Sequence, residues 1–502
     1  MQDAPVQRAR LVSHKQVKTI ALSPRATTAA LGSTLLLIAA GLIVYSQTYA
    51  YAFDEGFHLI AAQLIAQGKR PYLDFLFPQT PLNAYWNALL IRMFGPSWRA
   101  PHAAAAIETT LAVGLIADYV YRRLPEPSCR MGAAVFTLCS FGLNIAAVQF
   151  GTTAQAYGLC LLLVVAGFRA AIAAVDQRGI AFAALAGLLS SAAAASSLLT
   201  APFAPVLLLW IVVANRVGSR ITKSTAFIVG AIVPCLPLLW LLAQSPAKVI
   251  FDVLKYHLFF RTVNWSGWGS HDVEVALEWI DHSPALILVL LAAGGLLFVR
   301  KSGWDRTVKA EFYLCGLLAL IETIHLLNAH PTFTRYFLFT VPFLTIVASA
   351  GVCAYCAKLA SSSRPRAAVI IVCCIMVISV GKRLFQDRDD MAWADVEAIA
   401  AKVNQVTPPG APLYADEGVY FAGRRTPLPG MEYNDSHKLT MSADQAASLH
   451  IMRHEELDHM VRSGVFRTIE TCEDDEIDKY GLDTLYSNKE KISDCTVFWG
   501  FK

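Results

Sequence analysis

The sequence predicts an α-helical polytopic membrane protein of about 11 transmembrane helices with a small C-terminal α/β domain outside the cytoplasm. The 502-residue chain is 55% hydrophobic and only 16% charged, and its mean hydropathy is +0.46, which soluble domains rarely reach. Uncharged apolar runs long enough to cross a hydrocarbon core recur along the chain, beginning at residues 26–45. Lys and Arg are enriched in alternate connecting segments, as the positive-inside rule requires.

These apolar runs predict eleven spans. The division between the fifth and the sixth rests on a soft break in the sequence SSAAAASSLLTAPFAP, residues 190–205. The spans are expected at about residues 26–46, 101–121, 131–149, 153–174, 179–195, 198–214, 222–243, 283–299, 310–327, 336–357 and 366–381.

The basic residues predict the orientation. Residues 1–25 form a polar, basic tail, and the run after it is too long for the apolar core of a cleaved signal peptide. With this tail in the cytoplasm, twenty Lys and Arg fall in cytoplasmic segments and eight in outside loops. We therefore expect a multi-pass protein of the inner (plasma) membrane, with residues 26–381 as its transmembrane domain and the loops 47–100 and 244–282 and the domain 382–502 outside.

The first outside loop predicts two short helices in the membrane interface. The stretches EGFHLIAAQLIAQG and TPLNAYWNALLIRMFG have a helical apolar period, and Gly68 and Gly95 follow them. Asp54 and Glu55 lie at the start of the first helix. They are interpreted either as a helix cap with a dipole partner, or as a general base with its support at the mouth of a cavity.

A motif in this loop resembles the GT-C membrane glycosyltransferases, near the protein O-mannosyltransferase and aminoarabinose-transferase branch (glycosyltransferase family 39). The pattern DE-x-x-H/Y, G-x-x-P-Y-x-D/P and P-P/T-P-L-x-x-Y-W is matched by Asp54, Glu55, His58, Gly68, Pro71, Tyr72, Pro78, Pro81, Tyr85 and Trp86. The resemblance implies that Asp54 is the catalytic carboxylate with Glu55 beside it. It also implies that His58, Tyr72, Gln79, Tyr85 and Trp86 lie in the substrate cavity.

The resemblance further implies a reaction. The partners would be a polyprenyl-phosphate sugar donor, membrane lipid and a glycan, lipid or protein acceptor; no nucleic acid is expected. No cofactor is expected either, and a divalent metal is possible but not predicted. The aminoarabinose-transferase type has a Lys before its double proline, whereas this chain has Pro78, Gln79 and Thr80. The donor phosphate must therefore find its cation elsewhere.

Arg261 and Arg335 are the substitutes that the sequence offers. Arg261 follows Lys255 and His257 in an aromatic stretch of the long outside loop, and all three are candidate phosphate ligands. Arg335 precedes Tyr336 at the start of an apolar span. Both features also have an alternative interpretation. The aromatic stretch around Arg261 could be part of the aromatic belt at the membrane interface. Arg335 could be a cation whose long side chain reaches to the interface.

Two acids inside the spans are further candidates for the substrate cavity. Glu108 and Glu322 are expected one to two turns below the outer surface, where an unpaired carboxylate is costly. Structural ion pairs are the alternative, with Arg92 or Arg99 beside Glu108 and His325 beside Glu322.

The polar tail predicts a mixed domain. A helix is expected at about 391–406 and a strand from Pro412 to Ala415. A disulfide between Cys472 and Cys495 is plausible outside the cytoplasm. A second Asp-Glu-Gly sequence at 416–418 is interpreted as a coincidence in a loop, and residues 423–437 as a segment that could help to hold the acceptor.

The sequence thus predicts a glycosyltransferase that moves a sugar from a polyprenyl-phosphate donor to an acceptor on the outer side of the membrane. Two alternatives remain. One is a polyprenyl-linked glycan ligase or polymerase that uses His257 and Arg261. The other is a non-enzymatic lipid-sugar transporter, which the lack of an internal repeat disfavours.

Overall fold

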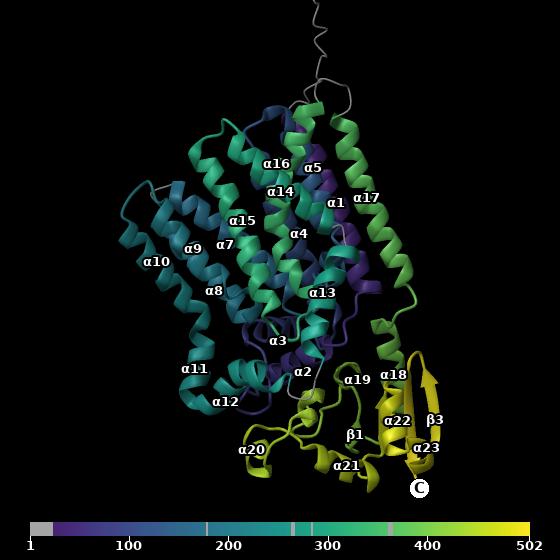
Figure 1. Ribbon diagram of the computed structural model, residues 1–502. Coiled ribbons are helices and arrows are strands. Elements are labelled where there is room, and N and C mark those ends of the chain that lie inside the picture. Colours follow the sequence, from purple (N-terminus) through teal and green to yellow (C-terminus); the bar gives the residue numbers. More distant parts are fainter. Residues whose placement is uncertain (1–23, 177–178, 263–266, 283–284, 360–364) are drawn as a thin grey trace, which may run out of the picture.

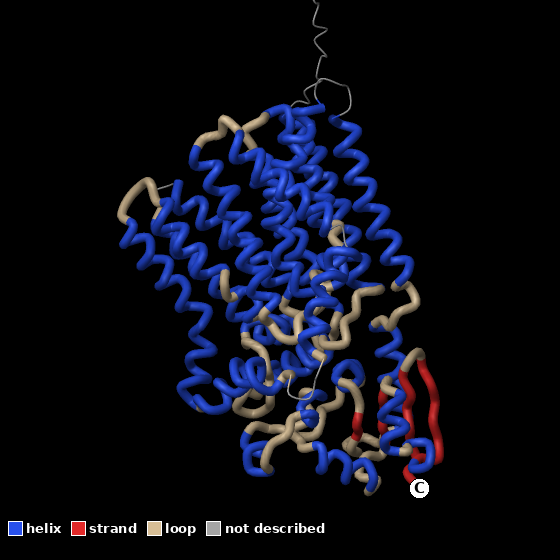
Figure 2. The backbone as a smooth tube through the Cα atoms, viewed as in Figure 1, coloured by secondary structure: helices blue, strands red, loops and turns tan. Residues whose placement is uncertain are grey.

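The protein is a bundle of long helices with a small α/β region at one end. The computed structural model describes residues 24–502, apart from 177–178, 263–266, 283–284 and 360–364. The expected basic tail therefore lies almost wholly outside the described residues. The helices of the bundle run side by side (Figure 1), and all strands lie in the C-terminal region (Figure 2).

Six segments of the bundle are long and apolar enough to cross a membrane. A seventh is formed if the two helices of a pair bent by 77° count as one span. The six are α1 (Pro24–Thr48), α4 (Arg99–Arg123), α7 (Tyr157–Asp176), α10 to α11 (Arg220–Ile232, η2 Val233–Cys235, Leu236–Gln244), α15 (Arg306–Leu327) and η4 to α16 (Thr334–Thr340, Val341–Leu359). The bent pair is α13 (Trp268–His282) and α14 (Ala285–Lys301).

The other predicted spans also contain apolar helices, which are shorter or broken except for the 22-residue helix Pro365–Gln386. They are α5 (Pro127–Gly142) with α6 (Ile145–Gln149), α8 (Ile180–Ser196), α9 (Phe203–Ala214) after η1 (Leu198–Thr200), and α17 (Pro365–Gln386). The span predicted at 131–149 breaks because Asn144 begins a new helix, its side chain accepting from the Ala146 N–H at 3.1 Å. The multi-pass helical class is confirmed, and the number of spans stays a prediction.

The predicted loop helices are present and lie across the end of the bundle next to the C-terminal region (Figure 1). They are α2 (Glu55–Ala66) and α3 (Leu82–Phe94), which pack on one another. The glycines that follow them, Gly68 and Gly95, have φ of +95° and +90°, which favours residues without a Cβ. α12 (Pro246–Ile250) and a π-helix, η3 (Phe251–Phe260), lie at the same end.

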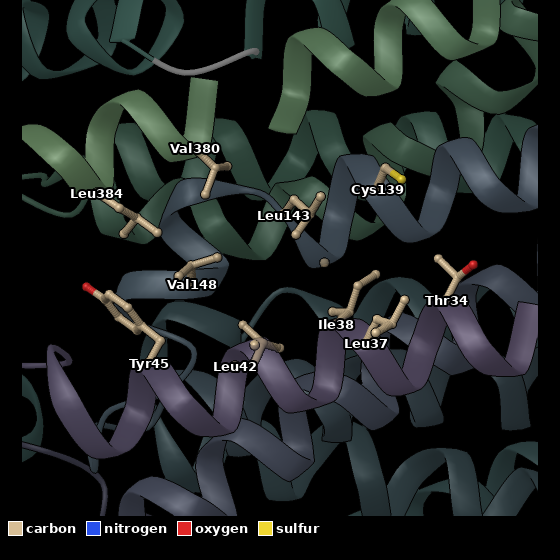
Figure 3. A pocket seen from close by; sticks show the side chains of 12 residues that line it. Thr34, Leu37, Ile38, Leu42, Tyr45, Cys139, Leu143, Val148, Val380 and Leu384 are labelled. Carbon is tan, nitrogen blue, oxygen red and sulfur yellow. The ribbon is translucent and has the colours of Figure 1, made fainter. Parts of the chain in front are cut away.

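An apolar groove runs along the side of the bundle that is formed by α1 and α17. Its volume is about 330 Å³. Figure 3 shows it between α1, α5, α6 and α17, with side chains from Thr34 to Tyr45 along α1 and with Val380 and Leu384 facing them.

The C-terminal region has the predicted mixed structure. Its helices are α18 (Trp393–Val406), α19 (Glu417–Ala422), η5 (Asn434–Lys438), α20 (Ala443–Ser448), α21 (His454–Arg462), α22 (Asp474–Tyr480) and α23 (Leu482–Leu485). Its strands are β1 (Leu413–Tyr414), β2 (Thr468–Thr471), β3 (Tyr486–Ile492) and β4 (Cys495–Phe501), in the order β1-β2-β4-β3. β1 is parallel to β2 and the other pairs are antiparallel. The plausible disulfide is present and joins Cys472 to Cys495.

The second Asp-Glu-Gly sequence does not lie in a loop, and that part of the interpretation was wrong, because Glu417 and Gly418 belong to a helix. Asp416 precedes helix α19, which packs directly on α2. A Cβ on Gly56 would lie 2.6 Å from the Gly418 nitrogen and 2.9 Å from the Glu417 Cβ. Glycine at position 56 therefore sets how closely the C-terminal region approaches the first-loop helices.

Replacing Gly56 with alanine is expected to push α19 away from α2. Overpacking of this kind costs about 1–3 kcal/mol, which we expect as a lower thermal unfolding temperature in detergent and faster proteolysis of the C-terminal region. Gly32→Ala on α1 is the matched control, because a Cβ there meets nothing within 4 Å. Equal behaviour of the two variants would contradict the packing argument.

Candidate functional site

Asp54 is paired with Arg335, a residue far away in the sequence. Asp54 occupies the position before α2, but its side chain makes no capping hydrogen bond there, so the cap interpretation was wrong. Its carboxylate instead accepts from the Arg335 guanidinium in an ion pair. The side chain of Asp54 is 41% exposed and that of Arg335 is 20% exposed. The two candidates that the sequence placed 281 residues apart thus meet where α2 begins and η4 begins.

Glu55 points away from this pair into the protein and is fully buried. Its Oε1 accepts from the Ala154 N–H at 2.6 Å and lies 2.5 Å from His102 Nε2, while its Oε2 accepts from Trp393 Nε1 at 3.2 Å. The other ring nitrogen, His102 Nδ1, donates to the Ser46 carbonyl at 2.7 Å. His102 Nε2 and Glu55 Oε1 must therefore share one proton. These contacts hold the start of α2, and the predicted role of Glu55 as the support of a catalytic Asp54 stays a prediction.

Two tryptophans carry this network into the C-terminal region. Trp393, at the start of α18, stacks on Trp98 with ring centroids 5.5 Å apart. The Trp98 indole in turn donates to Glu397 of α18 at 2.8 Å. Sequence reasoning missed His102 and Trp393. The available signals were a histidine at the start of the second predicted span and a tryptophan at the start of the helix predicted after the last span.

Arg261 lies in the same neighbourhood as Arg335. Its guanidinium donates to the Tyr336 hydroxyl at 2.6 Å. Both arginines pack against the Phe333 ring, Arg335 at 4.3 Å and Arg261 at 5.5 Å from its centroid. Two cations are thus held on shared aromatic side chains next to Asp54, which favours an anionic ligand between them.

One donor on Arg335 is left without a partner. Its Nε is buried and makes no hydrogen bond among the described residues. The Tyr157 hydroxyl also lies beside this guanidinium. An unsatisfied buried donor on a charged group is costly, so this guanidinium can bind a further acceptor.

The C-terminal region packs through Tyr433 against α2 and η3, the helices that adjoin Asp54 and Arg261. The Tyr433 hydroxyl is 2.9 Å from the Tyr256 hydroxyl of η3, and its ring packs edge-on against Phe57 at 5.2 Å. Tyr433 belongs to the 423–437 segment that was predicted to help hold the acceptor. The structure places one of its residues against α2 and η3, and its role with an acceptor stays a prediction.

His257 and Tyr72 hold the loop that carries Gln79. The His257 Nε2–H donates to the Pro78 carbonyl at 2.8 Å, and the Tyr72 hydroxyl donates to the Gln79 carbonyl at 2.6 Å. Burial, together with the charge of Arg261, lowers the pKa of His257 to about 4, so the imidazole is neutral at pH 7. These residues shape the segment in which the family's lysine is missing.

Among the described residues, His58 is one of three predicted cavity residues with a buried polar atom that makes no hydrogen bond; the others are Trp86 and Glu322. His58 is buried, stacks on Phe57 at 4.2 Å, and its Nδ1 has no hydrogen-bond partner among the described residues. Burial lowers its pKa to about 4, so this ring too is neutral at pH 7. The Nδ1 atom of His58 can therefore form a hydrogen bond with a neutral polar group of a substrate.

The predicted ion pairs of the intramembrane acids do not form. Arg92 donates to the Ala66 and Ile65 carbonyls, and Arg99 lies 3.7 Å from Glu397, so neither pairs with Glu108. The Arg92 guanidinium reaches backbone carbonyls at the end of α2, and that of Arg99, the first residue of α4, is directed towards α18 of the C-terminal region.

The pairing of Glu322 with His325 was wrong as well. His325 Nε2 contacts the Leu198 carbonyl at 3.2 Å, and both oxygens of Glu322 are buried without a partner among the described residues. The indole of Trp86 lies beside Glu108 without completing a hydrogen bond. Among the described residues, no hydrogen bond or ion pair joins Glu108 or Glu322 to Asp54, Arg261 or Arg335.

Two predicted site residues, Tyr85 and Lys255, form no hydrogen bond or ion pair with Asp54, Arg261 or Arg335 among the described residues. Tyr85 is half-buried in the cluster that packs α2 on α3. Lys255 is exposed, and it makes no hydrogen bond or ion pair with the other described residues. The structure therefore gives no support for Lys255 as a phosphate ligand.

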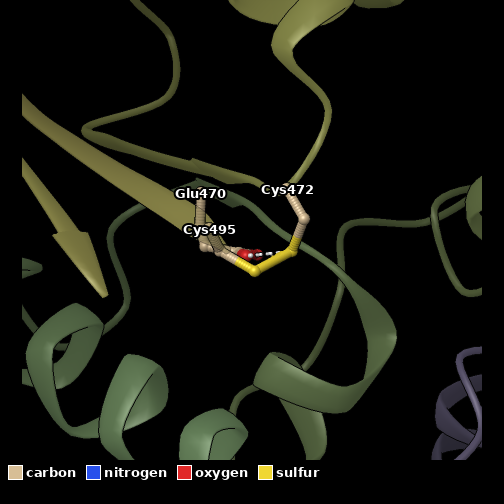
Figure 4. Close-up of side chains that lie close together, drawn as sticks. All are labelled: Glu470, Cys472 and Cys495. Carbon is tan, nitrogen blue, oxygen red and sulfur yellow. Dashed lines mark hydrogen bonds between the residues drawn. A yellow bond between two sulfur atoms is a disulfide. The ribbon is translucent and has the colours of Figure 1, made fainter. Parts of the chain in front are cut away.

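A metal centre is not formed by the described histidines, cysteines and acids at this site. The group of potential ligands that lie within 4.8 Å of one another is Glu470, Cys472 and Cys495 in the C-terminal region. Figure 4 shows that the two sulfurs form a disulfide, so neither is a thiolate. The Cys472 sulfur lies 3.3 Å from Asp416 Oδ2 and 3.4 Å from Glu470 Oε1, which ties the disulfide to the start of α19.

Replacing Trp393 with phenylalanine is expected to loosen α2. The change keeps the ring stack on Trp98 but removes the indole N–H that Glu55 accepts, a loss of about 1 kcal/mol. Hydrogen exchange should then rise in residues 55–66 and 152–156. Trp240→Phe on the exposed face of α11 is the control. Unchanged exchange in α2 would show that the Glu55 network does not anchor this helix.

The buried acids of α19 predict a pH dependence of stability. Burial raises the pKa of Glu417 to about 8 and that of Asp416 to about 7. The folded state therefore holds these protons more tightly than the unfolded chain, and stability should fall as the pH rises from about 5 to about 8. Glu417→Gln keeps the oxygen that accepts from the Asn434 N–H and should flatten the curve.

Thermal unfolding of the full chain in detergent at several pH values measures this effect. Asp475→Asn, at an exposed position of α22, is the control and should leave the curve unchanged. A wild-type unfolding temperature that rises towards pH 8 would contradict the argument.

Comparisons with known proteins support one fold. No family model matches this sequence, and no curated protein sequence matches it. Crystal structures of ArnT from Cupriavidus metallidurans match with a TM-score of 0.65 for the apo state and 0.62 for the complex with undecaprenyl phosphate. Each is 14% identical, and the matches cover 94% and 95% of this chain and 98% of ArnT.

The archaeal oligosaccharyltransferase AglB from Archaeoglobus fulgidus, in complex with an inhibitory peptide and a dolichol-phosphate, matches with a TM-score of 0.53. The sequences are 10% identical, and the match covers 88% of this chain and 69% of AglB. ArnT and AglB share the GT-C fold. This chain therefore has the GT-C fold that the first-loop motif implied.

Proposed function

We propose that this protein transfers a sugar from a polyprenyl-phosphate donor to a hydroxyl or amine acceptor at the membrane surface. The observation that carries the proposal is the Asp54–Arg335 ion pair beside Arg261, a carboxylate and two cations brought together by distant segments. The solved structures with this fold add support, because those of ArnT and AglB hold undecaprenyl phosphate and dolichol-phosphate.

The reaction needs the two kinds of group that meet here. The acceptor oxygen or nitrogen attacks the anomeric carbon, and the bond from that carbon to the phosphate oxygen breaks. The electron pair of this bond leaves with the polyprenyl phosphate, whose charge the guanidinium groups of Arg261 and Arg335 stabilise. The acceptor proton passes to Asp54, which acts as the base or orients the acceptor.

Donor binding would rearrange the ion pair. In the structure Asp54 and Arg335 neutralise one another, so neither is free for the reaction. A donor phosphate would replace the Asp54 carboxylate as the partner of Arg335 and would reach its unsatisfied Nε. The carboxylate released in this way could then accept a proton, which links catalysis to the presence of the donor.

The surrounding residues have supporting roles in this proposal. The neutral His58 offers its Nδ1 to a sugar or acceptor hydroxyl. Glu55 fixes the backbone that carries Asp54. Arg261 and Arg335 supply the positive charge, so we include no metal ion in the proposal. The Lys and Arg distribution further suggests that the site faces the outer side of the membrane, with the N-terminus in the cytoplasm.

Release of polyprenyl phosphate by the purified protein tests the proposal. The wild type, in nanodiscs with a panel of polyprenyl-phosphate sugars and candidate acceptors, is expected to release polyprenyl phosphate from at least one donor, as read by mass spectrometry. Asp54→Asn should lower the rate by about 10²-fold or more, because it removes the base while keeping the size of the side chain.

Asp74→Asn is the matched control, because Asp74 lies in the same loop and pairs with Arg70 by a surface salt bridge. It should keep the wild-type rate. Equal rates for wild type and Asp54→Asn would return Asp54 to a structural role. Loss of activity through Arg261 and His257 variants alone would favour a glycan ligase or polymerase, although His257 donates a hydrogen bond to the Pro78 carbonyl and to no other described residue.

A further inference from the structure

We propose that Asp272 of α13 is a positioning residue that sets where the two arginines of the candidate site lie. The inference rests on the proposed function, in which Arg261 and Arg335 stabilise the donor phosphate, and it adds a residue on which their arrangement depends. Among the described residues, the hydrogen bonds of Asp272 go to the segment just before Arg335 and not to either arginine.

The Asp272 carboxylate joins α13 to the segment that leads into η4. Its Oδ2 accepts from His330 Nδ1 at 2.6 Å, and its Oδ1 accepts from the Thr332 N–H at 2.7 Å. His271, the residue before Asp272, donates through its Nε2 to the Thr332 carbonyl at 3.1 Å. One turn of α13 thus holds both backbone polar groups of Thr332.

These bonds are largely shielded from water. The side chain of Asp272 is 9% exposed, and Thr332 is fully buried. A buried carboxylate is costly unless its oxygens are hydrogen-bonded, so the segment cannot leave Asp272 without a penalty. Trp279, two turns further along the same face of α13, stacks on Phe337 of η4 with ring centroids 4.8 Å apart. α13 is therefore held along η4 at two points.

Phe333 follows directly after this segment and carries both cations. Its ring centroid lies 4.3 Å from the Arg335 guanidinium and 5.5 Å from that of Arg261. The His271 ring packs edge-on against the same ring at 5.7 Å. The two arginines come from different parts of the chain, so a shift of Phe333 would change their spacing. Through Thr332, Asp272 fixes where Phe333 begins.

The spacing of the arginines matters for one part of the donor. A phosphate that contacts two guanidinium groups at once depends on the distance between them. The isoprenoid chain is uncharged and makes no such demand. A residue that acts through the arginines should therefore change the affinity for the phosphate, whereas a general loosening of the outer loop should change the affinity for the whole lipid.

Two lipids that differ only in the phosphate test this role without requiring turnover. The full chain in nanodiscs is titrated with undecaprenyl phosphate or with undecaprenol, and binding is read by native mass spectrometry. Asp272→Asn keeps the size of the side chain but offers one acceptor oxygen to two N–H donors. We expect the Kd for undecaprenyl phosphate to rise about tenfold, through the loss of a hydrogen bond to a charged group, and that for undecaprenol to stay unchanged.

Two further variants sharpen the comparison. Glu274→Gln is the matched control, because Glu274 is exposed on the same helix, and it should leave both constants unchanged. Phe333→Leu removes the ring that the arginines share and should weaken binding of undecaprenyl phosphate in the same way. Because Asp272 acts through Phe333, the double variant should bind less weakly than the sum of the two single losses requires.

His330 provides a second route if Asp272→Asn does not fold. His330→Phe keeps a ring against Trp268, which lies 4.3 Å from the histidine ring, but removes the Nδ1 donor. It should weaken binding of undecaprenyl phosphate and leave that of undecaprenol unchanged. His330→Asn offers a side-chain N–H in place of this donor and should restore the affinity.

Two results, in variants that unfold at the wild-type temperature, would overturn the proposal. One is equal weakening of both lipids, and the other is an unchanged affinity for undecaprenyl phosphate. Phosphate binding that depends on Asp272, in a wild type that transfers no sugar, would sink the proposed reaction and leave the positioning role standing. Sugar transfer that Asp54→Asn abolishes and Asp272→Asn leaves unchanged would do the reverse.

Discussion

The Glu55 carboxylate lies fully buried between the membrane helices and the C-terminal region, where it needs hydrogen bonds because water is excluded. It receives them from three separate segments: His102 of α4, the backbone at Ala154 and the indole of Trp393 in α18. One side chain thus fixes where α2 begins. The close contact of α19 at Gly56 fixes the same helix from the other side.

Fixing α2 has a direct consequence for Asp54, the residue before Glu55. With Glu55 directed into the protein, its neighbour is directed towards Arg335, and the two adjacent acids take different roles. The membrane helices supply Arg335, η3 and the turn after it supply Arg261, and the C-terminal region closes the group with Tyr433. The candidate site is therefore assembled by all parts of the chain, and it depends on how closely the C-terminal region docks.

Features encoded by local sequence could be predicted. The apolar runs predicted the membrane helices, the 3.6-residue period predicted α2 and α3, and the first-loop motif predicted the fold class and pointed to Asp54. Arg261 and Arg335 were found as cations near the outer interface, and the roles of all three residues stay predictions. Features that depend on the direction of side chains could not. Glu108, Glu322 and His325 lie at suitable sequence spacings for pairing, but packing turns their polar groups elsewhere. Likewise, α19 has only six residues, too few to show a helical period.

The most direct test of the account is a cryo-EM structure of the full chain in nanodiscs with undecaprenyl phosphate. We predict a phosphate within hydrogen-bond distance of both Arg261 and Arg335, an Asp54 carboxylate released from Arg335, and Glu55 unchanged on His102 and Trp393. A phosphate bound away from both arginines, with the Asp54–Arg335 pair intact, would contradict the account.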